Sequence, residues 1–209
     1  GLFEMSGIPY VGCDVETSAI GMDKAVSKRV ASAIGVPVLE DLWVLSSQWK
    51  NDRENVLLNI NKKLKFPVFV KPSRLGSSIG LNKAHNLKEV EEFLDVAFFY
   101  DTKVMVEESM EGAREINISI MGNNPYEVSA CEMPVSSGEV LSFDDKYTSK
   151  KGPSKGMASA KRIIPAPIKE ITRKKIEEYA KVFFAEIGGQ GMARIDFLIS
   201  KDECKIYLN

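Results

Sequence analysis

The segment at residues 71–80 reads KPSRLGSSIG and has the composition of an anion-binding loop. Small residues let a backbone approach a ligand closely, and successive amide groups can form a concave site for an anion. The hydroxyl groups of Ser77 and Ser78 and the ammonium group of Lys71 suit a polyphosphate. The loop does not match the Walker pattern G-x-x-x-x-G-K-S/T. A plain hairpin turn is the alternative interpretation of the loop taken alone.

The segment at residues 192–199 places an arginine and an aspartate on one face of a predicted strand. Its apolar side chains alternate with Arg194 and Asp196, which therefore point to the opposite face. Charged groups on a strand with apolar neighbours are costly unless they are paired or used. An aspartate can bind Mg²⁺, and an arginine can stabilise a carboxylate or a developing oxyanion. The alternative is a structural ion pair between strands.

Two further segments could contact a nucleotide. Lys24 stands at the start of a predicted helix, where a cation opposes the helix dipole by about 0.3–1 kcal/mol and a phosphate would offset that cost. Residues 104–110 leave a strand and enter a turn, which can present backbone groups to a purine edge. The carboxylate of Glu115 could accept hydrogen bonds from ribose hydroxyls. The alternatives are a solvated lysine and a surface hinge with solvated glutamates.

Residues 144–161 have no apolar periodicity and include five lysines, among them Lys146. An irregular stretch of this length is typical of a functional lid, and its lysines could cover phosphates on closure. A solvated basic loop is the alternative interpretation.

The composition narrows the class of protein. The chain has 209 residues and a net charge of −1, so we expect no nucleic-acid partner and no membrane contact. Three widely spaced cysteines indicate reduced thiols in a cytoplasm. With His85 as its only histidine, the sequence does not support a Ser-His-Asp triad or a histidine-rich metal site. No apolar run approaches the roughly 20 residues that span a bilayer.

The elements that must position these residues alternate irregularly. Apolar periodicity and capping signals predict strands at 8–11, 66–71, 79–82, 103–107, 114–121, 126–133, 139–143, 191–199 and 205–208, an extended segment at 36–45, and helices at 22–34, 55–64, 87–100 and 171–187. In this reading, 79–82 is the hairpin partner of 66–71. The order predicts an α+β fold in two lobes and not a regular βαβ series.

The motifs also occur in a characteristic order: GIPYVG at 7–12, SA at 18–19, MDK at 22–24, FVKP at 69–72, GSSIG at 76–80, VEE at 106–108, KY at 146–147 and ARIDF at 193–197. This combination closely resembles D-alanine–D-alanine ligases, a family of the ATP-grasp superfamily, over essentially the whole chain. The resemblance implies a nucleotide held between two α+β lobes. It assigns 1–20 to the end of an N-terminal domain and a linker, 21–103 to a central lobe, and 104–209 to a C-terminal lobe.

The resemblance also implies roles for the candidate residues. Lys24 and Lys71 match phosphate-binding lysines, and Ser77 and Ser78 match the loop that closes over the phosphates, with Ser77 also assigned to catalysis. The hinge residues that match the adenine contacts are Glu107, Glu108 and Met110.

The remaining matched residues belong to the reacting end of the site. Glu115 matches the ribose-binding carboxylate, and Lys146 and Tyr147 match a loop that reaches phosphate and closes the second amino-acid site. Arg194 matches the arginine that stabilises the transition state, and Asp196 matches a ligand of Mg²⁺ or Mn²⁺.

The implied reaction is the ATP-dependent ligation of two D-alanines through an acyl phosphate, for peptidoglycan synthesis. A D-serine or D-lactate acceptor and a non-catalytic ATP-binding module are the alternatives. The resemblance further implies a cytoplasmic homodimer for the full-length protein. Because the family places two more magnesium ligands just after the position of Asn209, we expect the 209 residues alone to be an inactive fragment.

Overall fold

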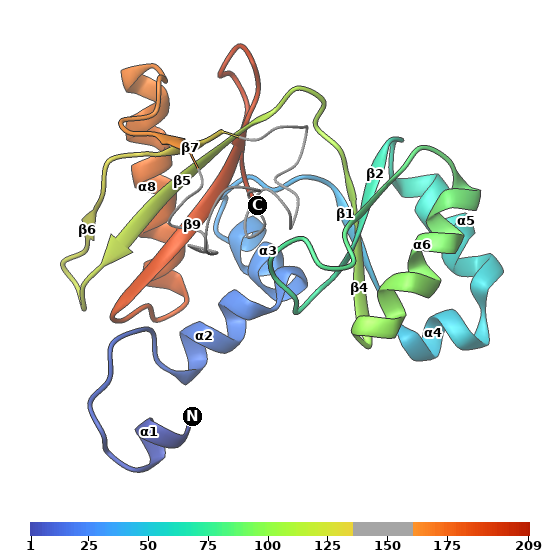
Figure 1. The fold of residues 1–209 in the computed structure, drawn as a ribbon, viewed down its shortest axis with the longest axis horizontal. Coiled ribbons are helices and arrows are strands. Elements are labelled where there is room, and N and C mark those ends of the chain that lie inside the picture. Colours follow the sequence, from blue (N-terminus) through green and yellow to red (C-terminus); the bar gives the residue numbers. More distant parts are fainter. Residues whose placement is uncertain (136–160) are drawn as a thin grey trace, which may run out of the picture.

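Alternating apolar residues build two separate antiparallel sheets in the computed structural model, which describes residues 1–135 and 161–209 (Figure 1). The first sheet has the strand order β1-β4-β2-β3. Its strands are β1 (Asp41–Leu45), β2 (Val68–Pro72), β3 (Asn82–Ala84) and β4 (Lys103–Glu108). The helices α4 (Ser46–Asn51), α5 (Arg53–Lys63) and α6 (Leu87–Tyr100) pack on one face.

The core of this first lobe follows the alternation of its strands. Val68 and Val70 of β2 and Val104 and Val106 of β4 are buried against the helices. Because successive side chains of a strand point to opposite faces, the side chains between these valines point away from the helices. That opposite face contributes the candidate site.

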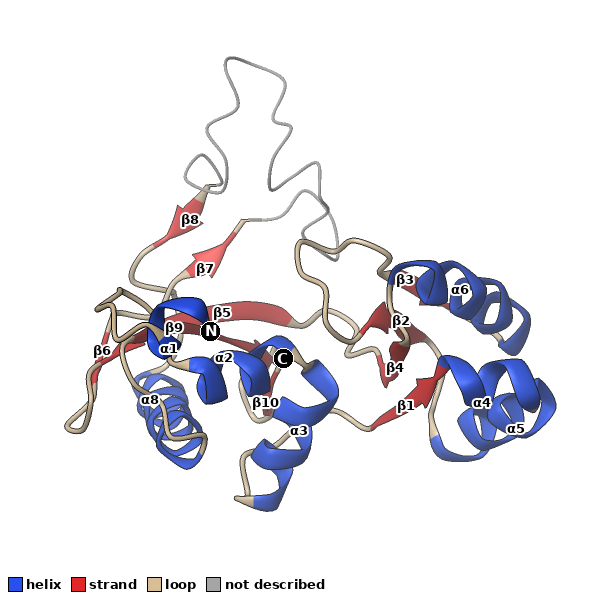
Figure 2. Ribbon diagram, turned by 90° about the horizontal axis from the view of Figure 1, so that it is seen from below, coloured by secondary structure: helices blue, strands red, loops and turns tan. Residues whose placement is uncertain are grey.

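The second sheet has the strand order β10-β9-β5-β6 and forms the second lobe. Its strands are β5 (Arg114–Met121), β6 (Glu127–Val128), β9 (Met192–Ile199) and β10 (Ile206–Leu208). The helices α3 (Lys24–Ala33) and α8 (Glu170–Glu186) contribute to its core (Figure 2). Two shorter helices precede α3, and a small separate sheet joins two short strands: α1 (Leu2–Met5), α2 (Val15–Met22), β7 (Met133–Pro134) and β8 (Arg162–Ile163).

Several sequence expectations agree with this fold. The helix at 87–100 has the bounds expected from its cap, since the side chain of Asn86 accepts a hydrogen bond from the backbone of Glu89. In β5 the three isoleucines are fully buried, as the alternation predicts. Residues 139–143 and most of 144–161, including Lys146 and Tyr147, lie outside the described residues.

Other expectations were wrong. Residues 8–11 form a loop with exposed apolar side chains and not a strand. The helix expected at 22–34 is present as α3, but it begins two residues later, because Asp23 has an extended backbone that ends α2 and caps α3. The hairpin partner of β2 is Asn82–Ala84 and not 79–82, because residues 74–80 are taken up by turns. The segment 126–133 pairs with β5 in two places and not as one continuous strand: Glu127–Val128 forms β6, and Glu132 makes an isolated antiparallel bridge with Asn117.

The division between the lobes also differs from the expected boundaries. Strand β4 lies inside the first sheet, so the sheets change between Glu108 and Arg114, whereas the sequence placed the division at residue 104. Helix α3 packs on the second lobe through Ala31, although residues 21–103 were assigned to the first. Among the residues that the structure describes, no helix is both long and apolar enough to cross a lipid bilayer.

Candidate active site

A cavity of about 470 Å³ is lined by residues of both lobes and of the hinge between them. Its walls include the following predicted site residues: Lys24, Lys71, Ser77, Ser78, Glu107, Glu108, Met110, Glu115, Arg194 and Asp196. These residues come from α3, β2, the β2–β3 loop, β4, the hinge, β5 and β9, so the fold gathers segments far apart in the sequence. Their roles toward a ligand stay predictions.

The β2–β3 loop has an unusual backbone at its two serines. Ser77 and Ser78 have φ angles of 56° and 60°, a left-handed conformation that costs a non-glycine residue of order 1–3 kcal/mol. Gly80 also has a positive φ, and a Cβ there would lie 2.9 Å from the Pro72 ring. The ammonium group of Lys24 donates a hydrogen bond to the carbonyl of Leu75. The close packing of Gly80 against Pro72 and the hydrogen bond from Lys24 of α3 therefore fix the position of the loop beside the cavity.

Three buried charges lie together next to α3, and two of them, Lys71 and Glu107, line the cavity. The carboxylate of Glu107 forms ion pairs with the ammonium groups of Lys71 and Lys28. Burial lowers the pKa of Lys28 to about 7 and lowers the pKa of Lys71 well below its ordinary value. The Glu107 carboxylate in contact with both groups acts in the opposite direction, because a neighbouring anion favours the protonated amine. We call these three residues the buried triad.

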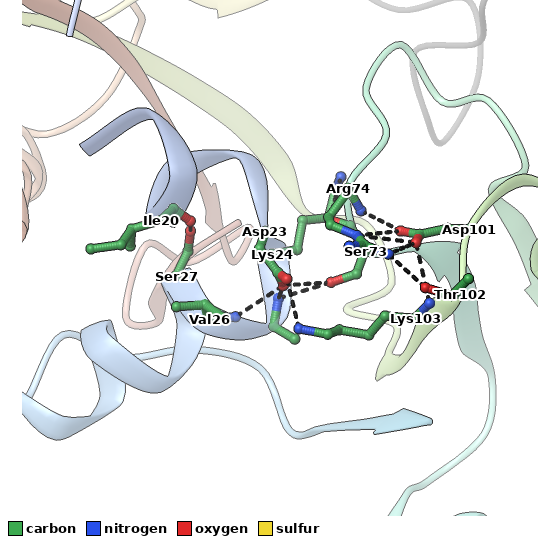
Figure 3. A network of polar contacts seen from close by, with 11 residues as sticks. Ile20, Asp23, Lys24, Val26, Ser27, Ser73, Arg74, Asp101, Thr102 and Lys103 are labelled. Carbon is green, nitrogen blue, oxygen red and sulfur yellow. Dashed lines mark hydrogen bonds and ion pairs between the residues drawn. The ribbon is translucent and has the colours of Figure 1, made fainter. Parts of the chain in front are cut away.

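A second polar network joins α3 to the first sheet (Figure 3). The side chain of Asp23 accepts hydrogen bonds from the backbone of Ala25 at 3.1 Å, from the Ser73 hydroxyl at 2.8 Å and from Lys103 Nζ at 2.6 Å. Burial alone would raise the pKa of Asp23, but the bonds from Lys103 and Ser73 lower it below its usual value. The side chain of Asp101 accepts a hydrogen bond from the Arg74 backbone at 2.8 Å, which orders the start of the loop.

Arg194 and Asp196 on β9 form an ion pair within a single strand. Arg194 donates to Asp196 through two hydrogen bonds, Nε to Oδ1 at 2.7 Å and Nη2 to Oδ2 at 2.8 Å. Hydrogen bonding to Asp196 raises the pKa of Arg194. Both side chains belong to one strand, so the pair is not the cross-strand ion pair considered from the sequence. Asn117 lies opposite Asp196 in the sheet, and its amide, oriented to donate, reaches Asp196 Oδ1 at 3.0 Å.

The donor set of the cavity fits magnesium only as part of a complex with phosphate. In the described part of the chain, no group of three or more His, Cys, Asp or Glu side chains is arranged to hold a metal ion. Mg²⁺ is commonly bound through one or two carboxylates together with the oxygens of substrate phosphates. Asp196 supplies one such carboxylate at the cavity wall.

The hinge offers a ligand an apolar surface, while the polar groups of Glu108 have partners within the protein. The Glu108 carboxylate accepts a hydrogen bond from the Lys65 backbone at 2.8 Å, and the Glu108 amide donates to Glu40 at 2.9 Å. These groups are therefore used within the protein. The cavity nearby is lined by apolar side chains that sequence reasoning missed: Phe69, Leu81, Met133 and Leu198. Strand parity could have predicted two of them, since Phe69 shares a face with Lys71 and Leu198 shares one with Asp196.

Two α+β lobes that enclose a cavity with a serine loop, lysines and an Arg–Asp pair define the ATP-grasp class of fold. Comparison with known proteins narrows the class. The family described as D-ala D-ala ligase C-terminus matches residues 30–209. The chain belongs to this family.

Similar proteins cover the whole chain. It is 38% identical over 209 residues to the D-alanine--D-alanine ligase of Heliobacterium modesticaldum and 39% identical over 212 residues to that of Acetivibrio thermocellus. The match covers 100% of this chain and 55% and 53% of those proteins, so the chain spans about half their length.

Solved structures agree in fold. The VanG D-Ala:D-Ser ligase from Enterococcus faecalis superposes with a TM-score of 0.84 at 30% identity, covering 100% of this chain and 57% of that one. The D-alanine-D-alanine ligase from Coxiella burnetii gives a TM-score of 0.78 at 26% identity, covering 100% and 52%.

Proposed function

We propose that the full-length protein containing this chain is an ATP-dependent D-alanine–D-alanine ligase. The observation that carries the proposal is the single cavity that brings Lys24, Lys71 and the serine loop together with Arg194 and Asp196. A cavity with cations at one wall and an Arg–Asp pair at another suits a triphosphate and a reaction at its terminal phosphoryl group. The family membership supports the same chemistry.

The binding half of the mechanism uses the first sheet together with α3 and the start of β5. Phe69 and Met110, which line the cavity, would provide an apolar slot for the adenine. Glu115, at the start of β5, accepts hydrogen bonds from the ribose. Lys71, Lys24 and the loop at Ser77 then face the phosphates, because all of them line the same cavity.

The chemical half uses the second lobe. The carboxylate of the first D-alanine attacks the γ-phosphorus, which breaks the bond to ADP and gives D-alanyl phosphate. The amine of the second D-alanine then attacks the acyl carbon, phosphate leaves, and one proton is released. Arg194 stabilises the charge that develops on the phosphoryl oxygens. A magnesium or manganese ion, when bound, neutralises phosphate charge, and Asp196 would hold it.

A second candidate is a ligase that joins D-alanine to D-serine. The likeness to the VanG D-Ala:D-Ser ligase favours it, at 30% identity and a TM-score of 0.84. Lys146 and Tyr147, which were predicted to close the second amino-acid site, lie outside the described residues. For the full-length protein we also propose a cytoplasmic location, a homodimer and a role in peptidoglycan synthesis.

The test is release of phosphate by the full-length protein with ATP, Mg²⁺ and D-alanine alone or with D-serine or D-lactate, with the products separated by mass spectrometry. We expect D-alanyl-D-alanine and one phosphate for each dipeptide. D-alanyl-D-serine as the main product would favour the second candidate. Nucleotide binding without phosphate release under all three conditions would overturn the enzymatic proposal and favour a binding module.

A further inference from the structure

Lys28 is a buried charge that does not line the cavity. Its side chain is 1% exposed, and its ammonium group contacts the carboxylate of Glu107. Removing a charge from water is costly unless a partner compensates it. Because Glu107 is the carboxylate that Lys28 contacts, the role of this lysine is to be sought in what it does for Glu107.

Glu107 has two cationic partners and a single negative charge. Lys28 contacts one of its carboxylate oxygens and Lys71 contacts the other. With both amines protonated, as contact with the carboxylate favours, the triad carries one positive charge in excess. Asp41 and Lys24 are the neighbouring charges that act on both lysines, in opposite directions, and Asp41 is itself paired with Arg29 at 3.0 Å. The excess charge of the triad thus faces a cavity in which an anion would balance it.

The triad also joins the two lobes. Lys28 is on α3, which packs into the core of the second lobe, while Glu107 is on β4 in the first sheet. A second ion pair connects the same two elements, between Asp23 before α3 and Lys103 at the other end of β4. The charges are complementary along both elements, negative then positive on α3 and positive then negative on β4. Lys24 lies between the two contacts on α3.

We propose that Lys28 is a positioning residue: it neutralises Glu107, so that the ammonium group of Lys71 can turn to the phosphates of a bound nucleotide. Without Lys28, Lys71 would be the only cation in contact with Glu107 among the residues that the structure describes, and moving to a phosphate would leave a buried carboxylate unpaired. This inference rests on the proposed function, because it requires a nucleotide in the cavity. Lys28 itself touches no substrate.

The test is a double-mutant cycle in the full-length protein with Lys28→Met, Glu107→Gln and the double variant. Calorimetric titration with magnesium and a non-hydrolysable ATP analogue gives the stoichiometry and the Kd together. We expect Lys28→Met to raise the Kd at least tenfold at unchanged stoichiometry. In the Glu107→Gln background, the same change should alter the Kd less than threefold. Lys174→Met, which removes an exposed lysine of α8, is the matched control and should leave the Kd unchanged.

Turnover separates positioning from a general loss of structure. A merely structural role would lower the active fraction and kcat, whereas the inference predicts a raised KM for ATP with kcat reduced less than threefold. If either single variant does not fold, the double variant, which removes both charges, must fold and bind the analogue. An unchanged Kd in Lys28→Met, an equal effect in both backgrounds, or a double variant without binding overturns the inference. No binding by the unaltered protein would instead overturn the proposed function.

Discussion

The two groups of charges in the cavity differ in how much water reaches them. In the buried triad, the side chains of Lys28 and Glu107 are 1% and 2% exposed, whereas those of Arg194 and Asp196 are 40% and 26% exposed. An exposed ion pair contributes about 0–1 kcal/mol to stability, because solvent screens it and compensates its loss. A buried pair from which one partner is removed leaves a charge that nothing compensates.

This difference suggests that the Arg194–Asp196 pair and the buried triad have different roles. The Arg194–Asp196 pair can open at little cost when a ligand arrives, so both charges are available for chemistry. Within the buried triad, the contact between Lys28 and Glu107 is suited to hold the lobes in place, while Lys71 is the member that we propose turns to a ligand. Stability measurements should therefore depend on the triad, and turnover should depend on the pair.

Glu107→Gln gives the largest expected effect, a loss of about 3–5 kcal/mol in the free energy of unfolding. Its physical reason is that the substitution leaves Lys28 and Lys71 buried without a counter-charge. Urea denaturation measures the loss. Glu108→Gln, a neighbouring carboxylate that accepts one backbone hydrogen bond, is the control and should cost less than about 1.5 kcal/mol. Equal losses in the two variants would show that the buried triad contributes no more to the free energy of unfolding than a single backbone hydrogen bond.

Arg194→Met should leave folding almost unchanged and lower kcat of the full-length protein by about 10²–10³-fold. The exposed position makes the structural cost small, while the lost charge is the one proposed to stabilise the transition state. Phosphate release and thermal melting are measured on the same sample. Arg53→Met removes another half-exposed arginine paired with an aspartate, on α5, and should change neither quantity appreciably. A large drop in melting temperature for Arg194→Met would contradict the claim that the exposed pair contributes little to stability.

Asp23→Ala should cost about 2–3 kcal/mol, between the buried and exposed cases, because Asp23 both caps α3 and pairs with Lys103. Asp14→Ala removes the matching cap of α2, which makes a single bond to the Thr17 backbone at 2.8 Å, and should cost about 1 kcal/mol. Chemical denaturation of both variants gives the difference. Similar values would mean that the contact between α3 and β4 adds little.

Local signals were enough to predict part of the fold and site. The helix at 87–100 is set by its cap and apolar face, and the faces of β5 and β9 follow from alternation, so Arg194 and Asp196 were placed together. The serine loop was predicted to bind an anion from its composition alone, because small residues let the backbone approach a ligand closely. These features depend on residues close in sequence.

The ion pair of Lys28 is an example of a contact that local sequence signals could not predict. Lys28 lies one helical turn after Lys24, but its partner Glu107 is on another lobe, 79 positions along the chain. Without the packing of α3 between the lobes, a solvated lysine would have the same sequence pattern. The strand expected at 8–11 failed for a related reason, since an apolar run becomes a strand only where a neighbouring strand pairs with it. Both cases depend on contacts between distant segments.

A carboxylate held by hydrogen bonds and not by deep burial gives the smallest expected effect. Glu203 accepts bonds from the Lys169 backbone at 2.9 Å, Arg114 at 2.7 Å and the Thr172 hydroxyl at 2.8 Å. Partial burial alone would raise the pKa of Glu203, but these bonds hold it at about 2. The folded-state pKa is below the unfolded value of about 4.3, so the contribution to stability is complete above that pH and is lost as the pH falls toward 2.

Glu203→Gln should therefore lower the free energy of unfolding by about 1–2 kcal/mol at pH 7, with a difference from the unaltered chain that narrows below about pH 4.3. Urea denaturation between pH 3 and 7 measures it. Glu186→Gln, at the exposed end of α8, controls for the loss of one surface carboxylate. A difference that is constant over this range would mean that Glu203 acts through packing and that its charge is irrelevant. Glu203, with a side chain that is 9% exposed, would then be a largely buried carboxylate whose charge adds nothing to stability, in contrast to Glu107 of the buried triad.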